Sequence, residues 1–208
     1  GRRRVGGVAR EGHQLVDRVG EESLLEGRGL DVGAGLPEGR HQEVRAAAGQ
    51  AAEAVVAYRK AVELDPKNTS AYVGLVYDLV AANKAAEAKA MALKATEIDK
   101  NSGSAFAALG YAISAERNFD GNHPSWTEAI AQAQQGVFLA PKDPHVQFVV
   151  AKLFEARGNY DQAQVAYLAA IAADPGYTPA KTAIIKNNFA RGDIDGALKA
   201  AEDLVKAN

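Results

Sequence analysis

A small side chain recurs at a nearly constant interval along the chain from about residue 50 onward. Successive members of the series lie 34, 41, 34 and 34 residues apart: Ala54, Ala88, Ala129, Ala163 and Ala197. The positions four and seven residues later keep the same spacing: Tyr58, Ala92, Ala133, Tyr167 and Ala201, then Ala61, Ala95, Gly136, Ala170 and Leu204. Offsets of four and seven place these residues on one face of a helix. Small residues there let two helices approach to about 8–10 Å, so the pattern predicts closely paired helices.

Helix boundaries recur with the same period. Helix-ending segments follow each copy of the pattern: Leu64-Asp65-Pro66, Ile98-Asp99-Lys100, Leu139-Ala140-Pro141 and Ala173-Asp174-Pro175. Asp143-Pro144 and Thr178-Pro179 each offer a capping side chain followed by proline, and Asn68 with its neighbours offers another cap. Residues suited to a left-handed conformation stand between the two helices of each unit: Gly49, Asn83, Gly158 and Gly192.

These residues resemble the tetratricopeptide repeat signature. The best copy is Gly158-Asn159-Tyr160-Asp161-Gln162-Ala163, followed by Tyr167, Ala170 and Asp174-Pro175. The resemblance implies an all-α, right-handed superhelical solenoid of antiparallel helix pairs with about 4.5 repeats. The expected units are 35–68, 69–102, 103–143, 144–177 and 178–208. The first unit departs from the pattern, because its leading helix at about 37–48 has only Val44 as a large apolar residue. A different helical-hairpin solenoid with the same period is the alternative.

In this family the first helix of each unit lines a concave groove. The equivalent repeat positions identify the residues of that face in this sequence. These residues are Ser70, Val73, Tyr77 and Val80; Ser104, Ala107, Tyr111 and Ser114; His145, Phe148, Lys152 and Glu155; and Pro179, Thr182, Lys186 and Phe189. The expected groove is aromatic at one end and basic at the other. Its predicted partner-binding residues are Val73, Tyr77, Tyr111, Ser114, His145, Phe148, Lys152, Lys186 and Phe189.

Each of these assignments has a structural alternative. Tyr77 and Tyr111 suit a binding surface, because tyrosine offers a wide ring and a polar tip, but both also suit packing between adjacent units. Lys152 and Lys186 suit an acidic side chain or a terminal carboxylate, but both also suit a solvated surface. Family members that bind chaperone tails use a lysine-and-asparagine clamp, and units two and three lack it at matching positions. Chaperone-tail binding is therefore not expected.

An insertion at 117–124 accounts for the single interval of 41 residues. Ser125 and Glu128 form a capping-box pattern that restarts the helix. Phe119 and Trp126 are expected to anchor the loop, and Phe119, His123 and Trp126 are predicted partner contacts because loops often add such contacts. Asp120, Asn122 and His123 lack a fourth ligand or a helical pair, so no metal site is predicted.

The first 50 residues differ in composition from the rest of the chain. They contain eight arginines, no lysine and eleven of the twenty glycines. Glycine disfavours helix by about 1 kcal/mol per position, so residues 1–34 are an atypical Gly/Arg-rich leader. Two interpretations stay open: a flexible leader, or a printed sequence that differs from the native one up to about residue 40.

Composition excludes several classes of function. The net charge of −2 argues against general nucleic-acid binding, which needs a basic surface. The absence of cysteine excludes disulfides and thiolate metal sites, and no apolar run is long enough to span a bilayer. The histidines are scattered, and no nucleophile elbow, phosphate loop or zinc-helix motif occurs. We expect a soluble protein that is not an enzyme and has no cofactor; the alanine-rich composition fits bacteria, with cytoplasm and periplasm both open.

The expected function is protein–protein interaction. The first hypothesis is a non-catalytic scaffold that binds a partner peptide or protein in the concave groove. The alternative is a structural accessory subunit, docked by its ends or convex face within a larger multi-protein assembly. The second helix of the last unit ends close to Asn208 and the first unit is degenerate, so apolar edges are expected at both ends. The sequence does not identify the partner or the oligomeric state.

Overall fold

The computed structural model describes residues 52–116 and 125–207. The Gly/Arg-rich leader, the leading helix of the first unit, Gly49, and the insertion with Phe119 and His123 lie outside the described residues.

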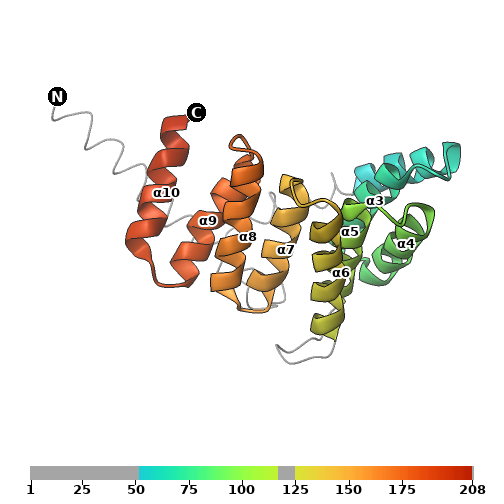
Figure 1. Cartoon of the computed structure of the whole chain (residues 1–208). Helices are drawn as coiled ribbons and strands as arrows, with labels where there is room; N and C mark the ends of the chain where they lie inside the picture. The colour runs from blue at the N-terminus through green and yellow to red at the C-terminus, as the bar shows by residue number, and fades with distance from the viewer. Residues whose placement is uncertain (1–51, 117–124, 208) are drawn as a thin grey trace, which may run out of the picture.

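The described residues form helices joined by short turns, and no strand occurs among them (Figure 1). A helix at 52–64 comes first. The helices that follow are α3 (Thr69–Ala81), α4 (Ala85–Ile98), α5 (Gly103–Ser114), α6 (Ser125–Leu139), α7 (Pro144–Ala156), α8 (Tyr160–Ala173), α9 (Thr178–Ala190) and α10 (Ile194–Ala207). Each expected unit from residue 69 onward holds one helix pair. The all-α solenoid is therefore confirmed.

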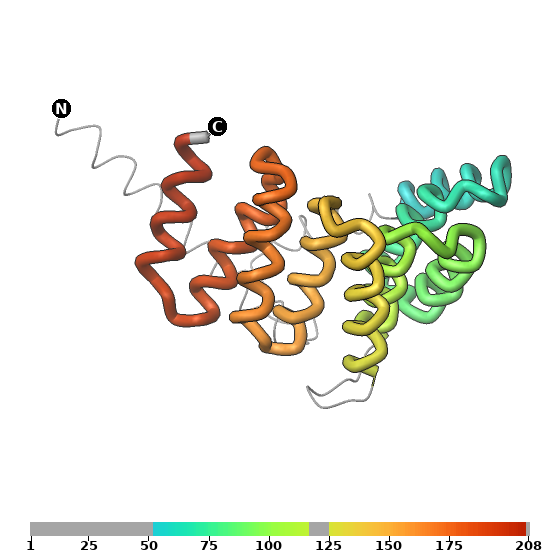
Figure 2. Tube along the Cα trace, viewed as in Figure 1, coloured from blue at the N-terminus to red at the C-terminus, as the bar shows by residue number. Residues whose placement is uncertain are grey.

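The helices lie in two layers, and the path of the chain follows them pair by pair (Figure 2). Within each pair the first and second helices pack closely, and α5 with α6 forms the most extensive contact. The first helices also contact one another, α3 with α5, α5 with α7 and α7 with α9. Among the described helices, no second helix has backbone contact with the next second helix. The first-helix layer is thus the more tightly spaced one, which makes it the inner, concave side of the curve.

The repeating small residues form the contact between paired helices. From α4 onward the members of the series are almost all fully buried: Ala88, Ala92, Ala95, Ala129, Ala133, Ala163, Tyr167, Ala170, Ala197 and Ala201. In the helix at 52–64 the equivalent residues are more exposed, and Tyr58 is 37% exposed. Nested alanines bury little area each, so larger side chains such as Leu75, Leu79, Ile113 and Leu153 fill the space beside them.

Helix starts follow the predicted caps with one correction. The Asn68 side chain accepts a hydrogen bond from the backbone N–H of Ala71 at 3.0 Å, and Asp143 accepts from the N–H of His145 at 2.9 Å. Ser102 caps α5 in the same way, at a position where no cap was predicted. The predicted Thr178 cap is wrong: Tyr177 is the N-cap residue of α9, and its side chain makes no capping bond. Thr178 Oγ1 donates instead to the carbonyl of Gly176.

The turns inside the units have the predicted left-handed residues. Asn83, Gly158 and Gly192 have φ values of 61°, 82° and 77°. Each reverses the chain directly after a first helix, where the backbone N–H bonds back to that helix: Gly158 donates to the carbonyl of Glu155, and Gly192 to that of Phe189. These turns fix the angle between the two layers.

Candidate functional site: the inner aromatic cluster

Aromatic side chains from three consecutive units meet on the inner layer. The ring centroids of Tyr77 in α3 and Tyr111 in α5 are 5.4 Å apart. On its other side Tyr77 meets His145 of α7 at 5.0 Å, edge to face with an interplanar angle of 84°. Such arrangements contribute about 0.5–1.5 kcal/mol per pair beyond their buried area. The register predicted these three residues on one face, and the structure brings them into contact.

The run of rings continues toward the last unit. His145 Nδ1 lies 3.0 Å from the hydroxyl oxygen of Tyr177, within hydrogen-bond distance. Tyr177 packs edge to face on Phe148 with centroids 5.8 Å apart, and Phe148 packs on Tyr167 of α8 at the same distance. We call Tyr77, Tyr111, His145, Phe148 and Tyr177 the inner aromatic cluster. Tyr167 lies beneath it as a fully buried support.

Burial keeps the phenols of the cluster neutral. It raises the pKa of Tyr77 far above its ordinary value, with smaller contributions in the same direction from Tyr111, Tyr177 and Asp143. Burial, and then the carboxylate of Asp143, raise the pKa of Tyr177 as well. The Tyr77 hydroxyl is buried without a hydrogen-bond partner among the described residues. The cluster is therefore an uncharged aromatic surface at neutral pH.

His145 is held in its neutral form for the same reason. Desolvation by burial lowers the pKa of this imidazole, and the nearby carboxylate of Asp143 only partly opposes that effect. A neutral imidazole can either donate to the Tyr177 hydroxyl or accept from it, depending on its tautomer. His145 is also the only histidine among the described residues.

This burial predicts a pH dependence of stability. The pKa of His145 is lower in the folded chain than in the unfolded chain, so the unfolded state binds more protons once the pH falls below the unfolded value. The contribution of neutral His145 to the free energy of unfolding is fully present above the unfolded pKa. It decreases as the pH falls from there toward the folded pKa. We expect the free energy of unfolding of the wild type to fall more between pH 7.5 and pH 5.5 than that of His145→Gln, as measured by urea unfolding. Parallel curves for the two proteins would contradict the assignment.

The basic end of the predicted groove carries an ion pair. Lys152 Nζ donates to Glu155 Oε1 at 3.1 Å, and the Tyr167 hydroxyl donates to the other carboxylate oxygen of Glu155. Two donors thus fix Glu155, whose side chain is only 15% exposed. A carboxylate from a partner would have to compete with Glu155 for Lys152.

The remaining predicted site residues lie in other surroundings. Val73 is 8% exposed and packs in the core with Tyr72 and Leu75. Ser114 is half-buried, and its hydroxyl donates to the carbonyl of Tyr111 at 2.7 Å.

The predicted site residues of the last unit and of the insertion also lie outside the inner aromatic cluster. Lys186 is half-buried on α9, and Phe189 packs against the small cluster of Ile185, Ala197 and Ala201. Trp126 is 6% exposed and packs into the core of units three to five, so its ring belongs to the interior.

Sequence reasoning missed Tyr177. It occupies the turn between two units, where the repeat pattern prescribes no aromatic residue, and its ring folds back onto the preceding first helix. Its position directly before Thr178-Pro179 was the available signal, because the start of a first helix lies beside the inner layer. Tyr167 was noted only as a member of the repeat series.

Neither a metal-binding group nor a membrane-spanning helix is found in the described ranges. No three His, Asp or Glu residues of residues 52–116 and 125–207 converge as metal ligands would. None of the helices described there has the length and apolar character required to cross a bilayer.

Comparison with known proteins identifies the repeat. The family model described as tetratricopeptide repeat matches residues 45–110. Among curated proteins, none matches the sequence significantly.

Solved structures of MamA share the fold. A crystal structure of MamA has 21% sequence identity and a TM-score of 0.52, covering 83% of this chain and 95% of that one. MamA from residue 41 to its end, from Desulfovibrio magneticus RS-1, has 12% identity and a TM-score of 0.53, covering 79% and 93%. YrrB, described as a TPR protein with an unusual peptide-binding site, has 24% identity and a TM-score of 0.48, covering 78% and 81%. The tetratricopeptide repeat model thus matches residues 45–110 of this chain, and the same helix pairing continues from there to α10.

Proposed function

We propose that the chain is a non-catalytic interaction scaffold that binds a partner peptide along the inner layer formed by α3, α5, α7 and α9. The observation that carries this proposal is the continuous run of rings from Tyr111 through Tyr77, His145 and Tyr177 to Phe148. A tetratricopeptide solenoid is an interaction module, and its inner layer is the side on which a peptide can touch several units at once. Partly exposed aromatic side chains supply large contact area at low entropic cost.

The chemistry of the cluster selects the kind of peptide. The phenols and the imidazole are uncharged, so an apolar or aromatic side chain of the peptide fits against them. Lys152 and Glu155 lie next to this surface and offer both signs of charge. A peptide with an apolar anchor and a neighbouring polar or charged residue therefore matches the inner layer. Because Lys152 is already paired, binding should depend more on the anchor than on charge.

The test uses peptides selected on the protein itself. A displayed library of random dodecamers is selected on the whole chain, and the enriched peptides are measured by fluorescence anisotropy. We expect Phe148→Leu, which keeps most of the volume but removes the ring, to weaken binding by about tenfold, the effect of a moderate hot spot of roughly 1.4 kcal/mol. Leu168→Ala on the outer side of α8 is the matched control and should leave the affinity unchanged.

The outcomes separate the proposal from a structural role of the cluster. Circular dichroism and urea unfolding establish that each variant is folded. Peptides that bind folded Phe148→Leu as tightly as wild type would contradict binding at the inner aromatic cluster. If only substitutions on the outer side weaken peptide binding, the binding site lies on the outer layer.

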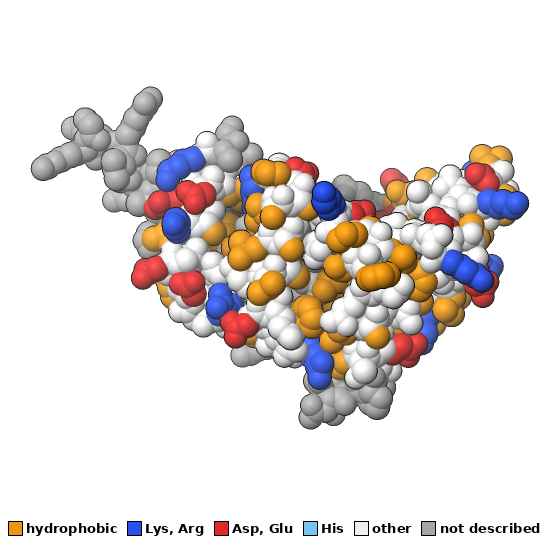
Figure 3. All heavy atoms as spheres, in the orientation of Figure 1, with side chains coloured by type: hydrophobic (Ala, Val, Ile, Leu, Met, Phe, Trp, Pro, Cys, Tyr) orange, Lys and Arg blue, Asp and Glu red, His pale blue; other side chains and the backbone are white. Residues whose placement is uncertain are grey.

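A second candidate function rests on the outer layer. Phe138 of α6 is 78% exposed and Val165 of α8 is 70% exposed, although both are large and apolar. Figure 3 shows apolar side chains gathered over α8 and α6 on this side. These exposed residues favour a structural subunit that docks by its convex face.

A further inference from the structure

The outer face of α8 is apolar and free of charge along most of its length. Val165 is 70% and Leu168 51% exposed, and Ala172 continues the same stripe. Spacings of three and four residues place these side chains on one helix face. Between Asp161 and Asp174 the sequence of α8 contains no charged residue. Single exposed apolar residues are ordinary, but a full helical stripe of them indicates a contact surface.

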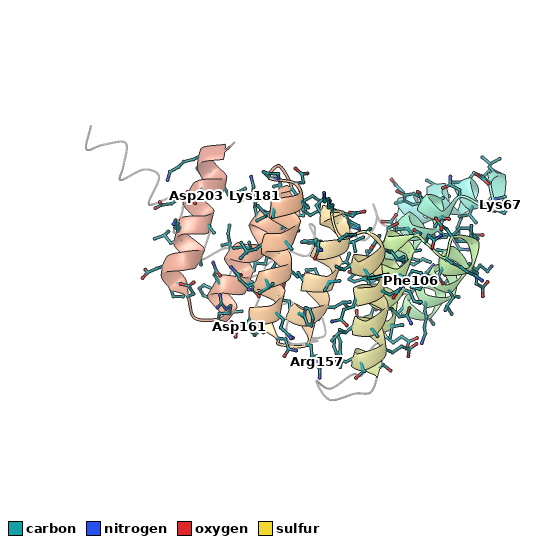
Figure 4. The ribbon with its side chains drawn as sticks, viewed as in Figure 1. Lys67, Phe106, Arg157, Asp161, Lys181 and Asp203 are labelled. Carbon is teal, nitrogen blue, oxygen red and sulfur yellow. The ribbon has the colours of Figure 1, made fainter. Side chains whose placement is uncertain are left out.

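Opposite charges stand at the two ends of this stripe. Asp161 lies in the first turn of α8 and stays 87% exposed even though Arg191 donates to it at 2.8 Å. Lys181 lies one turn into α9, which runs back along α8 after the turn at 174–177. Lys181 is therefore level with the last turn of α8, and Figure 4 labels the two residues at opposite ends of that helix.

We propose that the outer face of α8 binds the same face of a second copy of this chain, with the two α8 helices antiparallel. A two-fold axis crossing α8 between Val165 and Leu168 places these residues of both copies at the centre. Asp161 lies about 8 Å along the helix from that axis, at 1.5 Å per residue. The two-fold brings it to the end of α8 where Lys181 of the other copy lies. The contact is isologous, as a closed dimer requires.

Charge selects the antiparallel arrangement. If the two α8 helices were parallel, Asp161 would face Asp161 of the second copy, and Lys181 would face Lys181 of the second copy. Like-charge repulsion would then disfavour the contact. In the antiparallel arrangement both Asp161–Lys181 pairs are complementary. The stripe itself contains no charged residue, so an apolar and uncharged surface fits it best. A second α8 has that character.

Sedimentation equilibrium of the whole chain tests the proposal over a range that reaches about 100 µM, where even a weak micromolar dimer is populated. We expect the wild type to reach the mass of two chains. Val165→Glu with Leu168→Glu should weaken dimerisation at least tenfold, because it places four carboxylates at the centre of the contact. Leu93→Glu, at a residue 45% exposed on α4, is the matched control and should dimerise like the wild type.

The charged ends provide an independent arm. Asp161→Lys and Lys181→Asp should each weaken self-association several-fold, because each creates two like-charged pairs. A mixture of the two variants should form a mixed dimer with both pairs complementary again. That rescue excludes a loss of folding as the cause. The weakening in each single variant reports orientation, because a parallel dimer would have two like-charged pairs in the wild type and in each variant alike.

Two results would overturn the proposal. One is a wild type that stays monomeric at the highest concentration, and the other is a Val165→Glu, Leu168→Glu variant that dimerises as well as wild type. If Asp161→Lys and Lys181→Asp each dimerise as well as the wild type, the antiparallel arrangement is wrong. Phe148→Leu should leave dimerisation unchanged, so this test and the peptide test fail independently.

Discussion

Replacement of Tyr167 by alanine is expected to lower the free energy of unfolding by about 3–5 kcal/mol, the range for deletion of a large buried aromatic ring. Tyr167 is fully buried in the contact between α7 and α8, and its ring supports Phe148. Its hydroxyl also holds Glu155, so the alanine variant leaves both a cavity and a half-buried carboxylate with one donor fewer. Urea unfolding followed by circular dichroism measures the change.

Tyr167→Phe is the matched control, because it keeps the ring and removes only the hydroxyl. We expect a smaller loss of about 1.5–3 kcal/mol, the usual contribution of a hydrogen bond to a charged group. The difference between the two variants then measures the packing of the ring. A Tyr167→Ala variant as stable as Tyr167→Phe would show that the ring is not part of the core.

Gly110→Ala is expected to destabilise the chain by about 1–3 kcal/mol, the typical penalty for overpacking a close contact. A Cβ atom on Gly110 of α5 would lie 2.4 Å from the carbonyl oxygen of Ala129 in α6. That oxygen belongs to the backbone, so it can retreat only if the two helices move apart. The same holds for Gly136, whose Cβ would lie 2.6 Å from the carbonyl oxygen of Gly103.

The sign of the change in stability distinguishes a close helix contact from an open position. In an open helical position, a change from glycine to alanine stabilises by about 1 kcal/mol. Ala90→Gly at an exposed position of α4 measures that propensity term in this chain, and it should destabilise by a similar amount. A stabilising Gly110→Ala variant, in the same urea experiment, would contradict the close approach of α5 and α6.

The pairing of the helices was predictable from sequence because one physical constraint repeats. Two helices in close contact need small side chains at offsets of four and seven, and Ala88, Ala92 and Ala95 satisfy this in α4. Caps were predictable where a side chain and a proline agree, as at Asp143-Pro144. The prediction failed at Thr178-Pro179, since the helix begins one residue earlier than a threonine cap requires.

The inner aromatic cluster was predictable only in part. The register places Tyr77, Tyr111, His145 and Phe148 on the inner layer, because helical periodicity fixes which face a residue occupies. Their contacts across units depend on how closely the first helices approach, which the curvature of the solenoid decides. Tyr177 was missed because a turn residue has no periodicity.

The basic end shows a second limit of sequence reasoning. Lys152 was predicted as a carboxylate ligand from its position alone. The structure pairs it with Glu155, three residues away on the same helix, and Tyr167 of α8 holds that carboxylate in place. Sequence spacing permits the Lys152–Glu155 pair, but the third partner comes from another helix, and only the packing of α7 on α8 reveals it.

The most direct test of peptide binding at the inner layer is hydrogen–deuterium exchange of the whole chain with and without a selected peptide. The account predicts slower exchange in α5, in α7 and at the turn that carries Tyr177, with little change in α4, α6 and α8. Protection confined to α6 and α8 would contradict it, because the peptide would then lie on the outer layer.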